Sequence, residues 1–570
     1  MGEQGGAGLC GAVRPWWRWG GASLCFALPP VALRCLSCVA LRRSASLCVA
    51  PRRVAPRRVA PRRFALHRVA PCCIALQMAE DGTAVPWELP GCVVSVSDPS
   101  EPDVEPSSCS GAILCRSPGL VLCPAAILVP FLQPDVTAWP HGDALPPSAL
   151  RRGLHISVLQ AAPPSDTVQR HVACPLALLR CDAFARALPS TLSTAEESTE
   201  ALPWFCWLRV PGLDTPGGTW TPWAPAATLH KGAALLTCGT PFGALCPELF
   251  LNALSTGVLS NAAGPHRALL LTDARCLPGT QGGPVLALAP ASSPPRLVAV
   301  VAATADCQGG QGLGLALLCS LHALLQSARG VLPELSSLPP PLPLPEAHGA
   351  PTLRCAVLVE SGSSWGSGTL VAPRLLLTCR HVLQRGAPLR VTLRHSTTCD
   401  TILQARLVFA TTDESPFDVA VLELQDSVPS FQPPDLATTF QPGEAVLALG
   451  FGALGRACGP SVTGGVLSAV VGTPPVMLQS TCAVHAGSSG GPLLSARDGC
   501  LLGIVASNAR DNTAGTTYPH LNFCIPISLL RTPLARYRRS GNPAAFAPLN
   551  AASKGAQAAW RLQQRPPSKL

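Results

Sequence analysis

A glycine-rich loop occurs twice in this chain, and the repeat restricts what the chain can fold into. Residues 278–284 read PGTQGGP and residues 486–492 read AGSSGGP, so that Gln281 and Ser489 occupy the same place. Glycines at matching positions allow a tight backbone turn that other residues rarely adopt. Because 570 residues are too many for a single hydrophobic core, we expect two copies of one fold.

The similarity extends beyond the loop itself. An ungapped alignment of 257–286 with 465–494 agrees at eleven of thirty positions. Looser matches occur in the same order along the two copies. GLVLCP is similar to RLLLTCRH, and GAALLTCG is similar to GEAVLALG. We therefore predict five parts, which are a basic extension at 1–77, a first domain at 78–330, a proline-rich linker at 331–351, a second domain at 352–535 and a flexible tail at 536–570.

Both domains read as a series of short strands. The runs in the second domain are rich in Val and Leu and are bounded by Gly, Pro, Ser or Asp; they lie at 369–379, 389–395, 418–424, 444–450, 464–471 and 501–508. Regularly spaced short strands with turn residues between them are typical of β-barrels and sandwiches. The sequence therefore predicts an all-β protein.

The net charge of +10 does not indicate a nucleic-acid partner. Residues 1–77 hold 12 Arg against a single acid, which is +11, so the rest of the chain is 10 − 11 = −1. A nearly neutral body lacks the basic footprint of a nucleic-acid-binding protein. Residues 23–41 are apolar but contain two prolines and an arginine, so we predict no membrane span.

The first 77 residues contain the low-complexity repeat VAPRRVAPRRVAPRR. Because Met78 immediately precedes the first domain-like sequence, we interpret 1–77 as an artefact of start-codon choice or an isoform extension. A basic, acid-poor leader is also typical of a mitochondrial transit peptide.

Cysteine is abundant, with 26 residues, which in a secreted chain would suggest disulfides. Other signals point to an intracellular compartment, where thiols stay reduced. Cys35 and Cys38 form a lone CxxC, which lacks the four ligands of a structural zinc site. We expect no metal and no cofactor.

Three residues of the second domain form a candidate catalytic set. Ser489 lies between Gly487 and Gly490, where the backbone N–H groups of Gly487 and Ser489 can face one point and hold an oxyanion. His381 ends an apolar run and Asp418 precedes another. Each residue alone also fits a turn, a buried strand end or a strand start. Together they supply the nucleophile, base and orienting carboxylate that hydrolysis by a serine needs.

The segments TCRHV, DVAVL and GSSGGP resemble those of chymotrypsin-fold serine proteases, and within them the Deg/HtrA branch. The resemblance covers roughly 352–530 and implies two six-stranded barrels with a triad in the cleft between them. Ser489 would be the nucleophile, His381 the general base and acid, and Asp418 the orienting carboxylate. The fold class implied for the whole chain is tandem chymotrypsin-like double barrels, the first degenerate and the second catalytic.

In the first copy all three roles are expected to be lost. Gln281 replaces the serine, the histidine position falls near Pro124 or Ala125, and the aspartate position falls near Phe205. None of these side chains can attack, take a proton or orient an imidazole in the way that the triad requires. We expect this domain to pack against the second, to bind substrate or to mediate assembly.

The specificity pocket is expected to be uncharged. In proteases of this fold, the residue six positions before the nucleophile often forms the floor of the pocket, and here it is Ala483. The far wall would come from Val505 to Asn508. Without a carboxylate, this pocket implies cleavage after a small neutral residue such as Cys rather than after Arg or Lys.

The chain ends in Ser568, Lys569 and Leu570, and a terminal SKL is an address that the peroxisomal import receptor reads. A two-part trypsin-like chain with this ending is similar to peroxisomal processing proteases. The similarity implies a matrix endopeptidase that removes N-terminal leaders from precursor proteins, processes enzymes of fatty-acid β-oxidation, cuts itself and forms a homo-oligomer. Self-cleavage is expected in 165–203, a segment with Cys174 and Cys181 that we predict to be an exposed loop.

Two alternative functions follow from the same sequence. A non-catalytic scaffold or chaperone-like binding protein would use the fold without its chemistry. A mitochondrial protease would result if residues 1–77 are present and act as a transit peptide.

Overall fold

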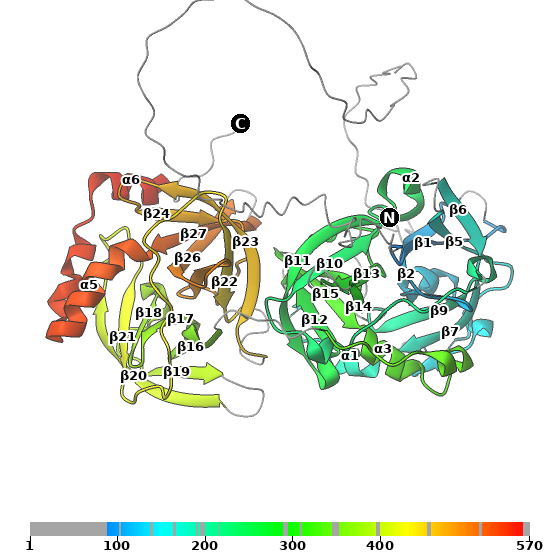
Figure 1. The fold of residues 1–570 in the computed structure, drawn as a ribbon, viewed down its shortest axis with the longest axis horizontal. Helices are drawn as coiled ribbons and strands as arrows, with labels where there is room; N and C mark the ends of the chain where they lie inside the picture. Colours follow the sequence, from blue (N-terminus) through cyan, green and yellow to red (C-terminus); the bar gives the residue numbers. More distant parts are fainter. Residues whose placement is uncertain are drawn as a thin grey trace, which may run out of the picture. The chain divides into compact units, whose positions relative to one another are not determined.

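The computed structural model describes residues 88–562 except for short gaps, which are 102–103, 137–138, 140, 163–166, 190–191, 194–199, 216, 289–293, 308–310, 345–352, 395–399, 453–457 and 512–515. The predicted extension at 1–77 and the SKL end at 568–570 lie outside the described residues. We call 88–344 the first half and 353–562 the second half. Each half contains two β-sheets (Figure 1).

The first half begins with a sheet of eight strands and continues with a sheet of seven. In spatial order, the first sheet is β4 (Ala144–Leu145), β7 (Cys174–Arg180), β9 (Trp204–Arg209), β3 (Gly119–Pro124), β2 (Ser107–Arg116), β1 (Gly91–Ser97), β5 (His155–Ala162) and β6 (Thr167–Val172). The second is β13 (Pro284–Ala287), β10 (Ala234–Gly239), β11 (Ala253–Ala263), β12 (Leu269–Thr272), β15 (Gln311–Ser320), β14 (Arg296–Cys307) and β8 (Leu192–Ser193). β13 also pairs with β14.

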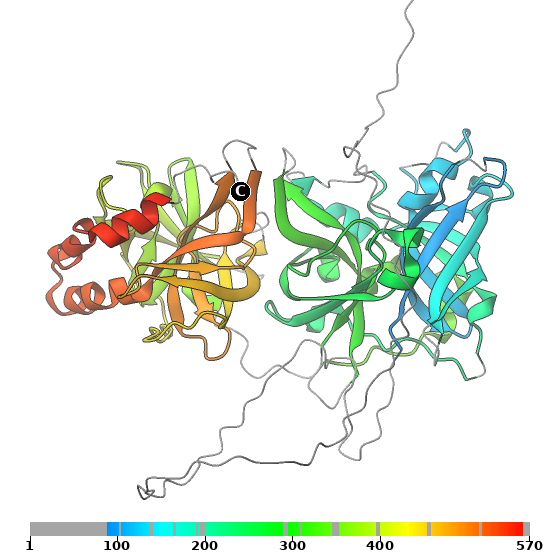
Figure 2. The same ribbon diagram turned by 90° about the horizontal axis from the view of Figure 1, so that it is seen from above.

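The second half contains two closed six-stranded barrels, as the resemblance implied. The first barrel is β16 (Ala356–Ser361), β17 (Ser364–Ala372), β18 (Leu375–Thr378), β21 (Ala420–Leu424), β20 (Asp400–Ala410) and β19 (Leu389–Arg394). The second barrel is β22 (Ala445–Gly450), β23 (Ser461–Val471), β24 (Met477–Ser480), β27 (Thr516–Pro526), β26 (Leu501–Asp511) and β25 (Pro492–Ser495). Figure 2 shows both barrels from a second direction.

Helices are short and few among the described residues. They are α1 (Asp182–Ala187), α2 (Pro247–Phe250), α3 (Leu321–Ala328), α5 (Ile527–Ser540) and α6 (Lys554–Leu562), with 3₁₀ turns that include η2 (Ala125–Phe131), η8 (Pro333–Ser337), η10 (Arg380–Val382) and η11 (Pro543–Asn550). Of the helices that the structure describes, none combines the length and the apolar character that crossing a bilayer requires.

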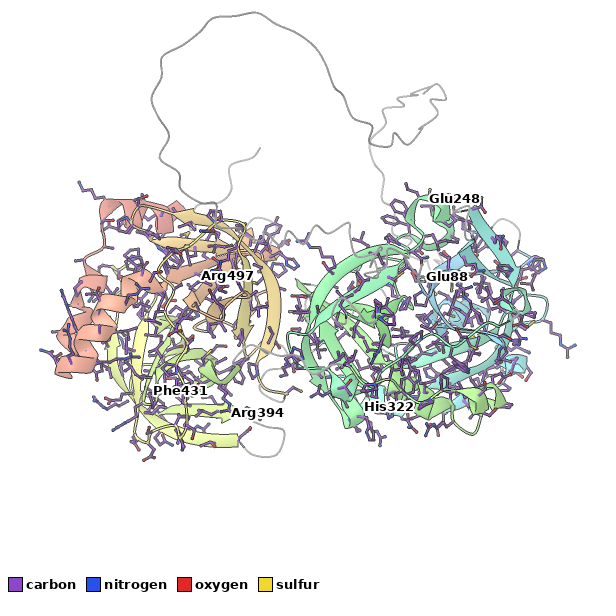
Figure 3. The ribbon with its side chains drawn as sticks, in the orientation of Figure 1. Glu88, Glu248, His322, Arg394, Phe431 and Arg497 are labelled. Atoms are coloured by element: carbon purple, nitrogen blue, oxygen red, sulfur yellow. The ribbon has the colours of Figure 1, made fainter. Side chains whose placement is uncertain are left out.

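Apolar strands form the sheets because their side chains fill the space between the sheets (Figure 3). In β18, the sequence LLLT is buried at every position, and it pairs with the equally apolar β21. Val and Leu suit such pleated, buried surfaces. This barrel wall places the residues that follow β18 and precede β21 side by side, which brings His381 to Asp418.

The two halves repeat the same strand pairing. A bulge between Leu370 and Ala372 of β17 corresponds to one between Ile113 and Cys115 of β2. The next strands pair in the same way, with Thr378 opposite Ala420 in one half and Cys123 opposite Cys206 in the other. This register aligns the first sheet of each half, where the sequence similarity is weakest.

Three polar side chains of the first half bind a single segment of the second. Lys231 Nζ donates to the carbonyl oxygens of Cys458 at 2.7 Å and Pro460 at 2.8 Å. Asn261 Nδ2 donates to Ser461 Oγ at 2.9 Å, and Asp273 accepts from the N–H of Gly464. The described residues of both halves belong to one compact unit. The first half therefore contacts β23, one strand of the second barrel, and the residues just before it.

Two of the predicted boundaries are wrong. The tail expected from 536 is ordered to Leu562, because buried Phe546 and Trp560 pack η11 and α6 against the second half. Part of the predicted extended linker packs on the first half, where Leu335 is buried and Trp223 Nε1 donates to the carbonyl oxygen of Pro339 at 3.1 Å. Proline content indicated a free spacer, but apolar residues between the prolines supply contacts.

Candidate active site

His381 and Asp418 meet at the edge of the first barrel. His381 lies in η10, directly after β18, and Asp418 lies two residues before β21. The Nδ1 atom of His381 is hydrogen-bonded to Asp418 Oδ2, and the backbone N–H of His381 donates to Asp418 Oδ1 at 3.0 Å. Both carboxylate oxygens therefore fix the position of the histidine, and Nε2 is the ring nitrogen left for a proton transfer.

The carboxylate of Asp418 is held in its charged form. Burial raises its pKa, but the hydrogen bonds from His381 and the charge of Arg380 outweigh the burial, so that the pKa lies below its ordinary value. Arg380 Nε lies 4.0 Å from Asp418 Oδ1. An ionised carboxylate at this place accepts a hydrogen bond from the imidazole Nδ1–H and stabilises an imidazolium.

Cys379, which precedes this pair, is a buried thiol. Its Sγ donates to the carbonyl oxygen of Val505 at 3.3 Å, and burial raises its pKa well above the ordinary value. Cys379, His381 and Asp418 place one ligand atom each within 4.8 Å of one another. Because the histidine nitrogen and the carboxylate bind each other and the thiol stays protonated, the arrangement fits a catalytic pair better than a metal site.

The loop that carries Ser489 is a turn that only glycine can make at two positions. Gly487 has φ of 90° and Gly490 has φ of 86°. A Cβ atom on Gly487 would lie 2.2 Å from the carbonyl oxygen of Phe451, and one on Gly490 would lie 2.2 Å from that of Ser367. In the part of the chain that the structure describes, no acceptor binds the N–H of Gly487 or of Ser489. Those two donors are free to hold a substrate oxygen.

Ser367 of β17 fixes this turn, and the sequence analysis missed this residue. Ser367 Oγ donates to the carbonyl oxygen of Gly487 at 2.6 Å and accepts from the N–H of Phe451 at 2.8 Å. The N–H of Ser367 donates to the carbonyl oxygen of Ser489 at 2.9 Å. The Ser-Gly pair at 367–368 matches the pair Ser110-Gly111. In each strand the serine lies three residues before the residue at which the bulge begins, Leu370 or Ile113. This repeat was the signal in the sequence that could have identified Ser367.

Gly366 of β17 lies close to both the histidine-bearing turn and the loop of Ser489. A Cβ atom on Gly366 would lie 2.7 Å from Val382, the neighbour of His381, and 3.3 Å from the carbonyl oxygen of Ser489. The Ser489 hydroxyl donates to the carbonyl oxygen of Ala506 at 3.4 Å. This hydroxyl is therefore bonded to a backbone carbonyl rather than to His381, and contacts between a nucleophile and its base are often loose without substrate.

The first half lacks the chemical groups at each of these positions. The strand register places Ala126 at the histidine position and Trp204 at the aspartate position, each one residue away from the predicted neighbourhoods of Ala125 and Phe205. Gln281 occupies the serine position. Ser110 still donates from Oγ to the carbonyl oxygen of Gly279 at 2.7 Å, so the turn is kept without the reactive groups.

Two of the predicted specificity residues, Ala483 and Asn508, are linked through Val484. Ala483 is buried, and its carbonyl oxygen accepts from Thr463 Oγ1 at 2.9 Å. Asn508 Nδ2 donates to the carbonyl oxygen of Val484 at 3.0 Å, and Val505 is buried. His485, which the sequence analysis passed over, lines a cavity of about 10 Å³ with Ala483. Burial lowers the pKa of His485 to about 4, so it is neutral and adds no charge here.

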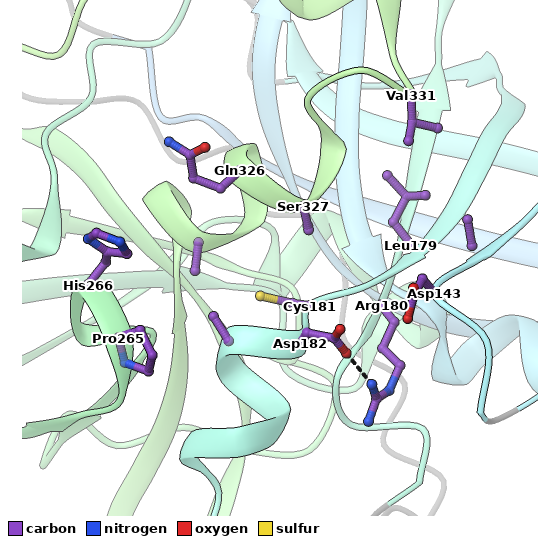
Figure 4. A pocket seen from close by; sticks show the side chains of 13 residues that line it. Asp143, Leu179, Arg180, Cys181, Asp182, Pro265, His266, Gln326, Ser327 and Val331 are labelled. Carbon is purple, nitrogen blue, oxygen red and sulfur yellow. Dashed lines mark hydrogen bonds and ion pairs between the residues drawn. The ribbon is translucent and has the colours of Figure 1, made fainter.

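The larger cavities of the described residues lie elsewhere. One of about 350 Å³ in the first half is lined by Cys181, His266 and the ion pair of Arg180 with Asp182 (Figure 4). Another of about 550 Å³ lies between Val476, α5, η11 and α6. Neither includes His381 or Ser489. Polypeptide substrates bind along extended surfaces, so proteolysis does not require a deep cavity beside His381.

The predicted self-cleavage segment is only partly exposed. Cys174 is exposed at the start of β7, whereas Cys181 is buried. The prediction of a loop without a counterpart is wrong, because β7 pairs with β9 as β20 pairs with β21. Cys181 therefore lies in the packed interior and is not available for cleavage in the folded chain.

Comparison with known proteins agrees with this geometry. Residues 366–504 match the model of the trypsin-like peptidase domain. A relative called peroxisomal leader peptide-processing protease from Mus musculus is 43% identical, over 84% of this chain and 96% of its own length. The relative of the same name from Homo sapiens is 42% identical, over 85% of this chain and 98% of its own length.

Among solved structures, a serine endoprotease from Yersinia pestis has 24% identity, covers 35% of this chain and 69% of its own, and has a TM-score of 0.29. The HtrA-type protease AlgW with tripeptide has 26% identity, covers 34% of this chain and 63% of its own, and has a TM-score of 0.28. The identity to the full-length relatives settles the classification. The chain is a trypsin-like serine endopeptidase and belongs to the family of peroxisomal leader peptide-processing proteases.

Proposed function

We propose that His381, Asp418 and Ser489 form the catalytic triad of this endopeptidase and that the first half carries no chemistry. The observation that carries the proposal is the two-point attachment of His381 to Asp418 beside the turn of Ser489. His381 Nε2 takes the proton of the Ser489 hydroxyl as Oγ attacks the scissile carbonyl carbon. The same nitrogen then returns the proton to the leaving amine.

The developing oxyanion is held by the N–H groups of Gly487 and Ser489. Support comes from the positive φ of Gly487 and from the contacts of Ser367, which bind the carbonyl oxygens of Gly487 and Ser489 and leave their N–H groups unused by any described residue. Losing one such donor typically reduces the rate by ~10²–10³. A water molecule that is activated by the same base, His381, then hydrolyses the acyl-enzyme.

The substrates we propose are peroxisomal precursors from which the enzyme removes N-terminal leaders, including enzymes of fatty-acid β-oxidation. The names of the relatives support the leader-processing part of the proposal. The uncharged surroundings of Ala483, Val505 and Asn508 favour cleavage after a small neutral residue such as Cys. Import through the receptor for the terminal SKL, assembly into a homo-oligomer and self-cleavage at an exposed site complete the proposal.

The test is to incubate the full chain with a leader-bearing precursor and to identify the new N-terminus by mass spectrometry. A single cut after Cys or another small uncharged residue is expected. Cuts after Arg or Lys would overturn the pocket assignment while leaving the protease intact. An uncut precursor, together with no labelling of Ser489 by a serine-reactive phosphonate, would instead favour a non-catalytic scaffold.

A further inference from the structure

The chain beyond α5 lies against the loop that leads to Asp418. η11 and α6 make up this C-terminal segment, residues 543–562, and Phe546 fixes η11 by stacking on Phe409 of β20, with ring centroids 5.5 Å apart. Tyr537 of α5 contacts Phe546 from another side, at 5.4 Å. The segment is thereby joined to the barrel that carries the histidine and the aspartate.

Hydrogen bonds connect η11 directly to the loop at 411–418. Ser415 Oγ donates to the carbonyl oxygen of Leu549 at 2.8 Å and accepts from the N–H of Phe417 at 3.2 Å. The N–H of Thr412 donates to Asn550 Oδ1 at 3.0 Å. Ser415 is buried, so water does not compete for its hydrogen bond to Leu549 while η11 is in place.

α6 contacts the residue that immediately precedes Asp418. The ring of Trp560 packs edge-on against the ring of Phe417, with centroids 6.3 Å apart. Trp560 Nε1 also donates to the carbonyl oxygen of Val476, which lies between β23 and β24 of the second barrel. Trp560 therefore spans both barrels while it covers Phe417.

The loop is held on its other side by residues of the first barrel. Thr411 Oγ1 donates to the carbonyl oxygen of Phe417 at 2.7 Å, and Arg380 binds the carbonyl oxygens of Thr411 and Thr412. These contacts fix the beginning of the loop. Thr411 also binds the carbonyl oxygen of Phe417, whereas the hydroxyl of Ser415 and the ring of Phe417 contact the C-terminal segment.

We propose that residues 543–562 are a positioning element that holds Asp418 against His381, beyond any role of the chain end as a targeting address. The proposal rests on the triad proposed above. Because a misplacement of about 1 Å in a catalytic group can cost ~10²-fold in rate, detaching the segment should slow catalysis without emptying the specificity pocket. The pocket residues Ala483, Val505 and Asn508 lie in or beside the second barrel.

The experiment compares two truncations of the full chain on a leader-bearing precursor. A chain that stops after Leu562 lacks the SKL end but keeps the segment, and it should cleave at the wild-type rate. A chain that stops after Gly541 lacks η11 and α6, and its kcat should fall by ~10²-fold with a KM within about threefold of wild type. Adding a peptide of residues 542–562 should restore part of the rate.

Point variants make the test independent of whether the shorter chain folds. Asn550→Ala and Ser415→Ala each remove a hydrogen bond between η11 and the loop at 411–418. Asn542→Ala instead removes the N-cap that Asn542 provides to the N–H of Ala544 within η11. Asn550→Ala and Ser415→Ala should lower kcat more than Asn542→Ala at equal thermal stability. Equal kcat in all three, or wild-type kcat in the chain ending at Gly541, would overturn the proposal. Wild-type protein that leaves the precursor uncut would instead refute the proposed function, so the two failures are distinguishable.

Discussion

In the first half, the side-chain oxygen Oε1 of Gln281 accepts a hydrogen bond from the N–H of Gly279 at 2.8 Å. Gly279 corresponds to Gly487, one of the two donors proposed to hold the oxyanion in the second half. The glutamine that replaced the nucleophile therefore fills, with its own carbonyl group, the place of a substrate carbonyl. The first half keeps the turn and satisfies its donor internally.

Restoring a serine to the first half should not restore catalysis. We predict that Gln281→Ser in a Ser489→Ala background cleaves no precursor, because Ala126 and Trp204 occupy the base and carboxylate positions. Gln281→Ala in an otherwise wild-type chain should keep kcat but lose about 1–3 kcal/mol of stability, since Gly279 N–H loses its acceptor. Activity assays and urea unfolding measure the two effects. Cleavage by the first variant would contradict the assignment of an inactive half.

Ser367 and Ser110 provide a matched pair for the role of the turn. Each hydroxyl bridges the turn to a backbone N–H, that of Phe451 in one half and Thr240 in the other. Both Ser→Ala changes should cost about 1–3 kcal/mol in unfolding free energy because buried groups lose partners. Only Ser367→Ala should also lower kcat, because its turn carries the proposed oxyanion donors. A similar loss of kcat in Ser110→Ala would show that the effect is one of general stability.

Alanine in place of Gly487 should abolish activity. Its Cβ would lie 2.2 Å from the carbonyl oxygen of Phe451 and 2.4 Å from the ring of Trp365, at a φ of 90° that alanine rarely adopts. Gly279→Ala meets similar contacts in the first half, 2.6 Å from the backbone nitrogens of Phe242 and Gly243. It should reduce stability while the remaining folded protein keeps its kcat. Phosphonate labelling of Ser489 counts the active sites in each variant, and normal labelling of Gly487→Ala would refute this prediction.

His485 should make the protein less stable in mild acid. Burial lowers its pKa to about 4, below the ordinary 6.5, so the unfolded chain binds the proton more readily. Stability from this residue is complete above pH 6.5 and is lost as the pH falls toward 4, by about 2 kcal/mol between pH 7 and pH 5. Asp273, whose pKa burial raises to about 6, changes stability in the opposite direction over that range. The difference between wild type and His485→Asn in urea unfolding at the two pH values isolates the histidine, and an unchanged difference would contradict its burial.

The sequence was sufficient for most strands around the proposed triad because these strands depend on local pattern. The predicted strands at 389–395 and 444–450 correspond to β19 and β22. Both runs are rich in Val and Leu and are bounded by turn residues. β20 was not predicted. Its exposed polar residues interrupt the apolar ones, which are themselves partly exposed, so the sequence shows no continuous apolar run there. Its pairing with β19 and β21 is decided by barrel closure, which no local window contains.

The contacts of the C-terminal segment were equally hidden in the sequence. Phe546 and Trp560 stand alone among Ala, Pro and Arg, and composition there favoured a flexible tail. Their burial depends on Phe409 and Phe417, which are more than a hundred residues away in the chain. The role of Gln281 likewise required the three-dimensional turn, whereas the repeated Ser-Gly pair was the one local signal for Ser367.

The most direct test of the account is the cleavage rate of a leader-bearing precursor by the full chain and by Ser489→Ala, measured side by side. The account predicts that the wild type cuts the precursor and that the variant loses ~10⁴–10⁶ of the rate while it keeps its stability. Cleavage by Ser489→Ala at a rate near that of the wild type would contradict the central claim that Ser489 is the nucleophile.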